Sequence, residues 1–431
     1  MTAFQRDALQ DFVDDGAKDH PPVFVGREDL LGEILTKAHR TLVRVRSGQQ
    51  AVPGNAIIIQ GAPGAGKSSV LSELATQNIQ PHVPKTLEIS SVELCDQFPD
   101  VLRAIGALGI TPKSQLRKLA QTVARTLGNL ALLDVLGRAD LSLNLATLFQ
   151  SHNIETIGSL HQVFPASQWD SPVIVAVDEA QNLSPSRDST YSRFLQAIHE
   201  ARTKLPLTLV CAGLGDTQSR LRDLGLTHGI RAHSLGSLTR AECSELLDRF
   251  CAHFGVTMEK CRGRALAVMD TTDGWPRHVH WAQQALAEAA LEPGINGNLD
   301  RITDWDRVQA RSDALRHGYY ATQFSQDMAV SRKLVGRVMF ELGKSRMEGQ
   351  HTTIGQVIDW VDAYADSGAS REWRIPKGHD AESYVTHLIH CGALQDDPDT
   401  GQLTCPIPSF QRYIITRGGL DPDQLPSPQA S

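Results

Sequence analysis

The segment AIIIQGAPGAGKSS, residues 56–69, constrains the fold of this 431-residue chain more than any other stretch. Its apolar run predicts a buried strand, and the residues from the lysine onward predict a helix. The three glycines between them let the backbone wrap closely around an anion, with amides at the start of the helix pointing inward. A strand, a glycine-rich turn and a helix in this order predict a parallel α/β sheet that carries a phosphate-binding loop.

The loop matches the pattern G-x-x-x-x-G-K-[ST], and two of its side chains have chemical tasks. Lys67 supplies positive charge to the β and γ phosphates of a nucleotide, and Ser68 offers a hydroxyl to Mg²⁺. A glycine-rich turn without a ligand is the structural alternative, but such a turn does not need a lysine and a hydroxyl after its last glycine. The loop residues predicted to bind the nucleotide are Gly61, Pro63, Gly64, Ala65, Gly66, Lys67, Ser68 and Ser69.

A second motif, VIVAVDE at residues 173–179, indicates the class of the nucleotide site. Its apolar run predicts a strand that delivers two adjacent carboxylates to the C-terminal edge of the sheet. Asp178 is predicted to hold Mg²⁺ together with Ser68, and Glu179 to orient and deprotonate an attacking water. For an Asp-Glu pair that stands alone, a solvated acidic turn is the alternative. Because this pair follows a phosphate loop, it favours ATP hydrolysis. No Asn/Thr-Lys-x-Asp sequence, which would recognise guanine, follows, so a GTP site lacks support.

Further apolar runs, each followed by a helical stretch, predict a parallel sheet of about five strands that is covered on both faces. The predicted strands lie at residues 56–60, 86–90, 172–178, 207–213 and 231–238. We therefore expect an α/β nucleotide-binding sandwich.

The rest of the chain is predicted to be mainly helical. Three helical segments and a β-hairpin after the turn DPDTG give residues 331–418 the element order of a winged helix, which is an α+β fold. The predicted domains are an N-terminal polar helix (1–21), the nucleotide-binding domain (22–238), a helical lid (239–295), a helical linker (296–330), the winged-helix-like domain (331–418) and a disordered tail (419–431).

Composition excludes several classes of protein. The formal net charge of −7 argues against a protein that coats nucleic acid. No window approaches the ~18 consecutive apolar residues of a membrane span, and the N-terminus does not resemble a signal peptide, so we expect a cytoplasmic protein without a membrane partner. The seven cysteines are odd in number and form no CxxC pair, which predicts reduced thiols rather than disulfides or a zinc site.

Four motifs resemble those of AAA+ ATPases, in the clade of the origin-recognition proteins, the transposition ATPases and the signalling ATPases called STAND proteins. They are FVGRE at 24–28, GAPGAGKS at 61–68, VDEAQ at 177–181 and GWPR at 274–277. The resemblance covers about residues 22–290. It implies that Val25 and Gly26 pack near the adenine.

The same resemblance implies roles for residues outside the loop. Arg277, at the start of a lid helix, would be the sensor 2 arginine that reaches the γ-phosphate and couples the lid to the nucleotide. Asp216 and Thr217 are the candidates for sensor 1.

AAA+ ATPases usually hydrolyse ATP between subunits, so the resemblance also implies a homo-oligomer or a hetero-oligomeric partner. Arg231 lies where the family places the arginine finger that acts on a neighbouring subunit, with Arg220 and Arg222 as alternatives. A surface arginine without this role is the structural alternative.

Two regions bear on DNA as a partner, and they disagree. The insert at 101–133 contains no carboxylate. We predict that its positive charges contact a DNA backbone through Lys113, Arg117, Lys118 and Arg125. A solvated basic helix face without this role is the alternative. By contrast, residues 331–431 hold 10 Lys plus Arg against 13 Asp plus Glu, and the expected recognition helix HDAESYVTHLIHCG has no Lys or Arg. A helix that reads base edges normally brings such side chains, so we expect this domain to pack or to bind a partner protein.

The sequence therefore predicts an AAA+ ATPase that binds and hydrolyses Mg·ATP as a conformational or assembly switch, acting with DNA or with a protein partner. A STAND-like signalling switch that controls an effector, in defence against phage or mobile elements, is the first alternative. An ATP-binding scaffold without turnover is the second.

Overall fold

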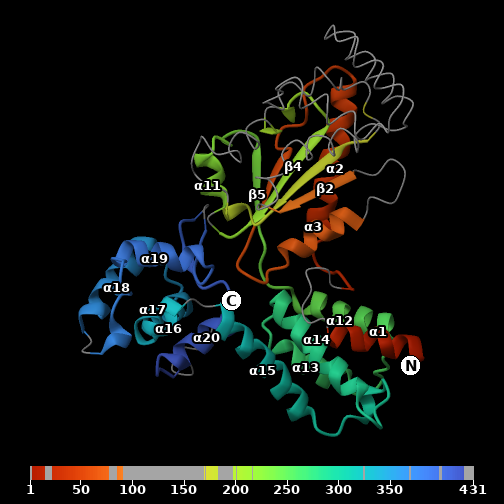
Figure 1. Ribbon diagram of the computed structural model, residues 1–431, viewed down its shortest axis with the longest axis vertical. Helices are drawn as coiled ribbons and strands as arrows, with labels where there is room; N and C mark the ends of the chain where they lie inside the picture. Colours follow the sequence, from red (N-terminus) through yellow and green to blue (C-terminus); the bar gives the residue numbers. More distant parts are fainter. Residues whose placement is uncertain are drawn as a thin grey trace, which may run out of the picture.

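The structure is a computed structural model that describes residues 2–14, 22–76, 85–90, 169, 171–182, 198–199, 201–215, 217–323, 326–367, 370–397 and 400–421. Figure 1 shows a sheet domain at the top, a helical lid at the lower right and a C-terminal helical domain at the lower left. The long helix α15 (Trp305–Gln323) runs between the lid and the C-terminal domain. The predicted residues Lys113, Arg117, Lys118 and Arg125 lie outside the described residues, as does Asp216.

Within the described residues, the sheet has five strands, all parallel, in the order β2-β3-β4-β1-β5. The strands are β1 (Ala56–Gln60), β2 (Lys85–Ser90), β3 (Val173–Asp178), β4 (Leu207–Gly213) and β5 (Ile230–Ser234). The register pairs Gln60 with Gly213 and Val177 with Cys211, so the C-terminal ends of β1, β3 and β4 meet at one edge. Because ligands of open α/β sheets bind at this edge, the predicted α/β fold is confirmed in the arrangement that a nucleotide site needs.

Helices cover the sheet, as the continuous apolar strands require. Strands β1 and β4 are buried along their whole length, whereas the edge strand β5 is only partly covered. In the described part of this domain, the helices are α2 (Glu28–Arg46), α3 (Lys67–Thr76), α11 (Thr217–Asp223) and the short η4 (Ala180–Asn182). Helix α3 begins at the lysine of the phosphate loop, as predicted.

The lid consists of α12 (Arg240–Phe254), α13 (Arg262–Asp270) and α14 (Pro276–Leu291). Thr239 and Glu242 form a capping box that starts α12. The N-terminal helix α1 (Ala3–Asp14) lies against α12 and α14, far from it in sequence (Figure 1). Its Phe12 is buried, with its ring 5.4 Å from that of Phe250, so the lid core includes the beginning of the chain.

The C-terminal domain follows η5 (Leu299–Arg301) and α15. It contains α16 (Gln326–Val330), α17 (Arg332–Met347), α18 (Ile354–Ser367), η6 (Arg371–Trp373), α19 (Ala381–His390), the hairpin β6 (Gln395–Asp396) and β7 (Leu403–Thr404), and α20 (Pro408–Arg417). Helices α17, α18 and α19 followed by a hairpin give the predicted winged-helix order. A Cβ on Gly336 of α17 would lie 2.8 Å from the Cα of Gly418, so two glycines let α17 and the end of α20 pack closely.

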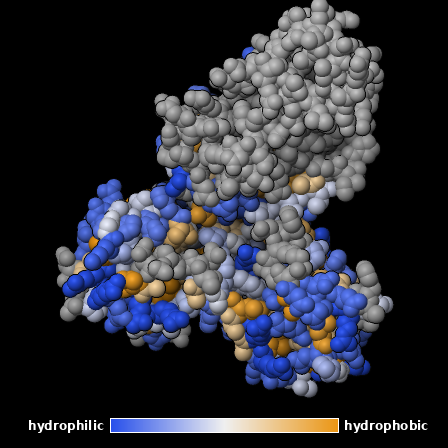
Figure 2. Space-filling view, viewed as in Figure 1, coloured by the Kyte–Doolittle hydropathy of each residue, from blue (hydrophilic) through white to orange (hydrophobic). Residues whose placement is uncertain are grey.

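The described surface is mostly polar. In the view of Figure 2, hydrophilic residues dominate the lid and the C-terminal domain, with small separate apolar spots between them. None of the helices in the described part of the chain is both long enough and apolar enough to cross a membrane. The cysteines in that part are free thiols: Cys211, Cys243, Cys251, Cys261, Cys391 and Cys405.

A buried polar cluster joins the lid to the C-terminal domain. The Nε2 of His278 in α14 lies 3.1 Å from the hydroxyl of Tyr320 in α15, and its Nδ1 lies 3.1 Å from the hydroxyl of Ser409 in α20. The two hydroxyls are 2.8 Å apart. Burial, followed by the nearby charge of Arg316, lowers the pKa of His278 to about 3. The imidazole is therefore neutral at physiological pH and bonds both partners.

This cluster predicts a pH dependence of stability. Above pH ~6.5, His278 is neutral in the folded and the unfolded chain; as the pH falls further, only the unfolded chain takes up the proton. Its contribution to the free energy of unfolding should then decrease by about 1.4 kcal/mol per pH unit. We expect the stability difference between wild type and His278→Gln, measured by urea unfolding at pH 7, 6 and 5, to shrink on acidification. A constant difference for His278→Gln would contradict the prediction.

Candidate functional site

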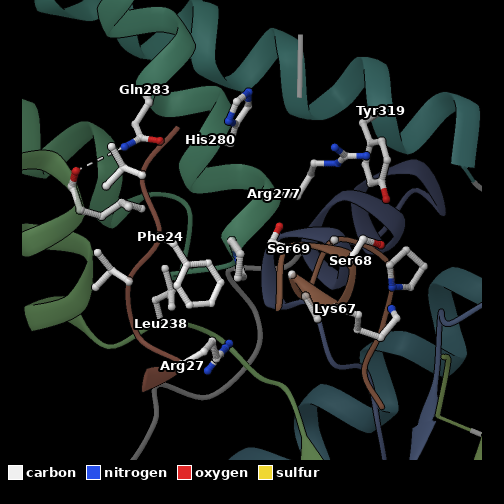
Figure 3. Close-up of a pocket in the computed structure, with 18 of the residues that line it drawn as sticks. Phe24, Arg27, Lys67, Ser68, Ser69, Leu238, Arg277, His280, Gln283 and Tyr319 are labelled. Atoms are coloured by element: carbon white, nitrogen blue, oxygen red, sulfur yellow. Dashed lines mark hydrogen bonds between the residues drawn. The ribbon is translucent and has the colours of Figure 1, made fainter. Parts of the chain in front are cut away.

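A cavity of about 460 Å³ lies at the C-terminal edge of the sheet, a volume within the usual range for small-ligand sites. All three parts of the molecule line it. The sheet domain contributes the phosphate loop, the lid contributes Arg277, and the C-terminal region contributes Tyr319 and Cys391. Figure 3 shows Lys67, Ser68 and Ser69 at one end of the cavity and Phe24, Leu238 and Gln283 at the other.

The phosphate loop has the backbone that a closely bound anion requires. Gly64 and Gly66 have φ values of 82° and 91°, in the left-handed region that favours glycine. Lys67 is buried, and its Nζ donates to the carbonyls of Gly61 at 2.9 Å and Ala62 at 3.3 Å. Burial lowers the pKa of Lys67, and the nearby carboxylates of Glu179 and Asp178 partly oppose this effect. The loop thus holds an ammonium group ready for an anionic ligand.

The predicted magnesium ligands lie together. The Ser68 hydroxyl donates to Oδ2 of Asp178 at 2.7 Å, which joins the start of α3 to the end of β3. Oδ1 of Asp178 accepts a bond from the backbone N–H of Glu179 at 2.8 Å. A hydroxyl beside a carboxylate, next to a phosphate loop, is an oxygen donor set that fits Mg²⁺.

Glu179 has an uncommon backbone for a residue with a side chain. Its φ is 52°, it is exposed, and it lines the cavity. Its carboxylate accepts a hydrogen bond from the side-chain amide of Gln181 in η4. Gln181 is the last residue of the VDEAQ motif, and its sequence context alone predicted no role for it.

The other end of the cavity is mainly apolar. Its wall is formed by Val23, Phe24, Val25, Leu238 and Leu246, with the polar side chains His280 and Gln283 above them. Val25 therefore lines the cavity, and its packing near an adenine stays a prediction. Gly26 lies beside this wall with a φ of 85°, and a Cβ there would be 2.7 Å from Oε1 of Glu242. The flat apolar wall with a few polar groups fits a nucleobase.

The lid contacts the phosphate loop directly. The indole N–H of Trp275 donates to the Pro63 carbonyl at 3.1 Å, and the backbone N–H of Arg277 donates to the Gly64 carbonyl at 3.1 Å. The guanidinium carbon of Arg277 lies 5.8 Å from the ring centre of Tyr319. A Cβ on Gly64 would be 2.7 Å from the Cβ of Arg277, so the loop needs glycine here for packing as well as for φ.

The C-terminal domain also touches the loop, a contact that the sequence analysis did not predict. A Cβ on Gly392, which follows α19, would lie 2.4 Å from Cδ of Pro63. Gly392 has a φ of 76°, so glycine is favoured there by conformation too. A Cβ on Gly215, after β4, would lie 3.3 Å from Cγ of Gln395 in β6. The C-terminal domain thus meets the nucleotide edge of the sheet at two places.

Some predicted residues lie away from the cavity. Arg231, the candidate arginine finger, is on the edge strand β5 with 59% of its side chain exposed, and its Nη1 is 3.2 Å from Oε1 of Glu33. Thr217, a sensor 1 candidate, is buried at the start of α11. Arg220 donates to the backbone carbonyl of Gln181 at 2.5 Å. In the described part of the chain, no cluster of His, Cys, Asp and Glu forms a separate metal site.

The fold and the site define a P-loop NTPase of the AAA+ type: a parallel α/β sheet with a glycine-rich loop after β1, an acidic strand end beside it and a helical lid. The chain belongs to the novel STAND NTPase 1 family, whose family model matches residues 9–288. The match covers the second half of α1, the sheet domain and nearly all of the lid. It ends before the C-terminal domain. Among the curated proteins, none matches the chain.

Several solved structures are similar over nearly the whole chain. The ORC2 protein of Aeropyrum pernix, in ADPNP–ADP complexes, is 14% identical over 95% of this chain and 96% of its own, with a TM-score of 0.46. A RuvB variant of Thermotoga maritima is 15% identical over 93% of this chain and 98% of its own, with a TM-score of 0.42. Cdc6p of Pyrobaculum aerophilum is 16% identical over 94% and 98%, with a TM-score of 0.38. Sequence identities and TM-scores this low do not support a conclusion about function.

The position of Lys67 leads to a test that separates folding from binding. Replacing Lys67 by Met removes a buried ammonium group, so the melting temperature should stay the same or rise. Affinity for a fluorescent ATP analogue should fall about 100-fold, because charge-assisted contacts to phosphate are lost. Lys37, which donates to the Gly54 carbonyl at 3.0 Å, gives the control Lys37→Met, with unchanged affinity expected. Wild-type affinity in Lys67→Met would contradict the assignment of the loop.

Proposed function

We propose that the protein binds and hydrolyses Mg·ATP and uses the state of the nucleotide to control the docking of its C-terminal domain. The observation that supports this most is that one cavity has walls from all three parts of the molecule. Pro63 of the phosphate loop contacts Gly392, and Gly64 contacts Arg277, so a ligand on the loop lies between the two moving parts. A nucleotide can then shift the balance between docked and undocked forms by its different contacts with each.

The residues have distinct tasks in binding. The loop amides and Lys67 hold the phosphates, and the apolar wall with Phe24, Val25 and Leu238 holds the adenine. Ser68 and Asp178 hold Mg²⁺, which neutralises charge on the phosphates when bound.

The hydrolytic step is assigned to Glu179. It lines the cavity beside the magnesium ligands, where its carboxylate can orient a water and take its proton. Arg277 starts the lid helix with its side chain in the cavity, so it can stabilise charge on the terminal phosphate and report its presence to the lid.

The C-terminal domain is proposed to dock in the ADP state and to leave in the ATP state. Cys391 of this domain lines the cavity, so the docked domain lies beside the bound nucleotide. A γ-phosphate adds volume and charge to the same cavity and is proposed to weaken docking, while Arg277 of the lid contacts it.

A protein effector fits the C-terminal domain better than DNA does. Arg332 and Lys333 of α17 both pair with Glu372, Arg337 pairs with Glu341, and the expected recognition helix α19 has no basic residue except histidine. A DNA-linked role therefore rests on the basic residues between 101 and 133. Arg231 is proposed to act on the site of a neighbouring subunit, since it is exposed on the edge strand of the sheet.

The catalytic assignment is tested with Glu179→Gln, which keeps size and hydrogen bonding but cannot accept a proton. We expect the hydrolysis rate to fall at least 100-fold with ATP affinity unchanged within about twofold. The exposed lid residue gives the control Glu259→Gln, which should hydrolyse ATP at the wild-type rate. Phosphate release should be measured with and without duplex DNA.

The outcomes separate the alternatives. Absence of turnover in the wild type would leave an ATP-binding scaffold and overturn the hydrolase proposal. Stimulation by duplex DNA would support the DNA-linked role over the signalling switch. Wild-type turnover in Glu179→Gln would show that another group activates the water.

Docking is tested with Gly392→Ala, because the new methyl group would overlap Pro63. The control is Gly401→Ala: Gly401 also has a positive φ, of 68°, but nothing lies within 4 Å of a Cβ there. Both substitutions cost about 1–2 kcal/mol of backbone strain. Only Gly392→Ala should also weaken docking and accelerate ADP dissociation about tenfold, measured by displacement of a fluorescent ADP analogue. Equal rates in the two variants would contradict the docking contact.

A further inference from the structure

Gln181 has a buried side chain next to the nucleotide cavity, and the proposed hydrolysis assigns no role to it. It lies in η4, directly after the strand that carries Asp178 and Glu179, and only 7% of it is exposed. A buried amide needs partners for both its N–H groups and its oxygen. Its partners show where it points.

Both ends of the Gln181 amide are bonded. Nε2 donates to the carboxylate of Glu179, and Oε1 accepts from the backbone N–H of Leu214 at 3.1 Å. The backbone carbonyl of Gln181 accepts from Arg220. Because Oε1 is engaged by a donor, the amide nitrogen must face Glu179 and cannot exchange places with the oxygen.

The loop after β4 is built to receive this side chain. A Cβ on Gly213 would lie 2.7 Å from Oε1 of Gln181 and 2.2 Å from Oγ1 of Thr217, so only glycine lets the loop approach. Leu214, the next residue, supplies the N–H and also lines the cavity. Gly213 thus allows the loop after β4 to lie close enough for the Leu214 N–H to bond the Gln181 amide oxygen.

The same loop contacts the C-terminal domain. Gly215 follows Leu214 and packs against Gln395 of the β6–β7 hairpin. The contacts therefore form a continuous series that begins at Gln395 and Gly215 and continues along the backbone to Leu214. The N–H of Leu214 then bonds the Gln181 amide, and this amide bonds the carboxylate of Glu179. A shift of the hairpin would displace the loop that orients the amide.

We propose that Gln181 is a positioning residue for hydrolysis: it fixes the Glu179 carboxylate and makes its position depend on the loop that the C-terminal hairpin touches. This inference rests on the proposed role of Glu179 in activating water. Glu179 follows the last residue of β3 and is exposed, so burial in the sheet does not hold its carboxylate in place. The amide of Gln181 supplies that constraint.

Two substitutions separate the two ends of the amide. Gln181→Glu has nearly the same shape and still accepts the bond from Leu214, but it places a negative charge beside Glu179. Gln181→Leu removes both bonds. We expect kcat for ATP to fall about tenfold in each variant with KM unchanged within about twofold, because only the positioning of the attacking water is impaired.

The split between kcat and KM distinguishes positioning from a merely structural role, because a general loss of folded protein would lower kcat and the melting temperature together. The control Gln411→Leu removes a buried amide that donates to the Met339 carbonyl at 2.7 Å inside the C-terminal domain, and it should keep wild-type kcat despite a lower melting temperature.

The outcomes can be told apart from those of the proposed function. If Glu179→Gln abolishes turnover but Gln181→Glu keeps wild-type kcat, the positioning role is wrong and the hydrolase proposal stands. A kcat loss of the same size in Gln411→Leu would show that kcat only follows the loss of melting temperature, and it would also overturn the positioning role. If Glu179→Gln keeps wild-type turnover, the proposed function fails and the positioning role fails with it.

Discussion

The contact that the rest of the structure depends on is the close approach of the lid to the phosphate loop. The carbonyls of Pro63 and Gly64 accept hydrogen bonds from Trp275 and from the backbone of Arg277, more than 200 residues further along the chain. A side chain at position 64 would overlap Arg277. The same short segment carries the amides proposed to bind phosphate, so a bound phosphate and the lid would share it. Movement of either affects the other.

The C-terminal domain is held to this segment from two sides. Gly392 packs on Pro63, and the buried cluster of His278, Tyr320 and Ser409 joins the lid to α20. A few hydrogen bonds contribute on the order of 1 kcal/mol each. The proposed population shift requires a ligand that binds the docked and the undocked forms with different affinities.

The parts of the fold with local sequence signals could be predicted. The strands have continuous apolar runs, the loop has its glycines and lysine, and Thr239 and Glu242 start the lid helix with a recognisable cap. The contacts of Gly392 with Pro63 and of Gln181 with Leu214 could not, because they join segments far apart in sequence and depend on tertiary packing. Glycines without a turn motif, such as Gly213, were the available signal: they mark places where another chain segment comes close. The finger role of Arg231 stays a prediction, since a single chain does not contain the neighbouring site.

The central claim is that the nucleotide controls the docking of the C-terminal domain on the phosphate loop. It is tested most directly by the distance between spin labels at the exposed residues Thr36 in α2 and Thr386 in α19, measured by pulsed electron paramagnetic resonance. With ADP we predict one narrow distance distribution, matching the docked arrangement. With a non-hydrolysable ATP analogue and Mg²⁺ we predict a longer and broader distribution. The same narrow distribution with both nucleotides would contradict the account.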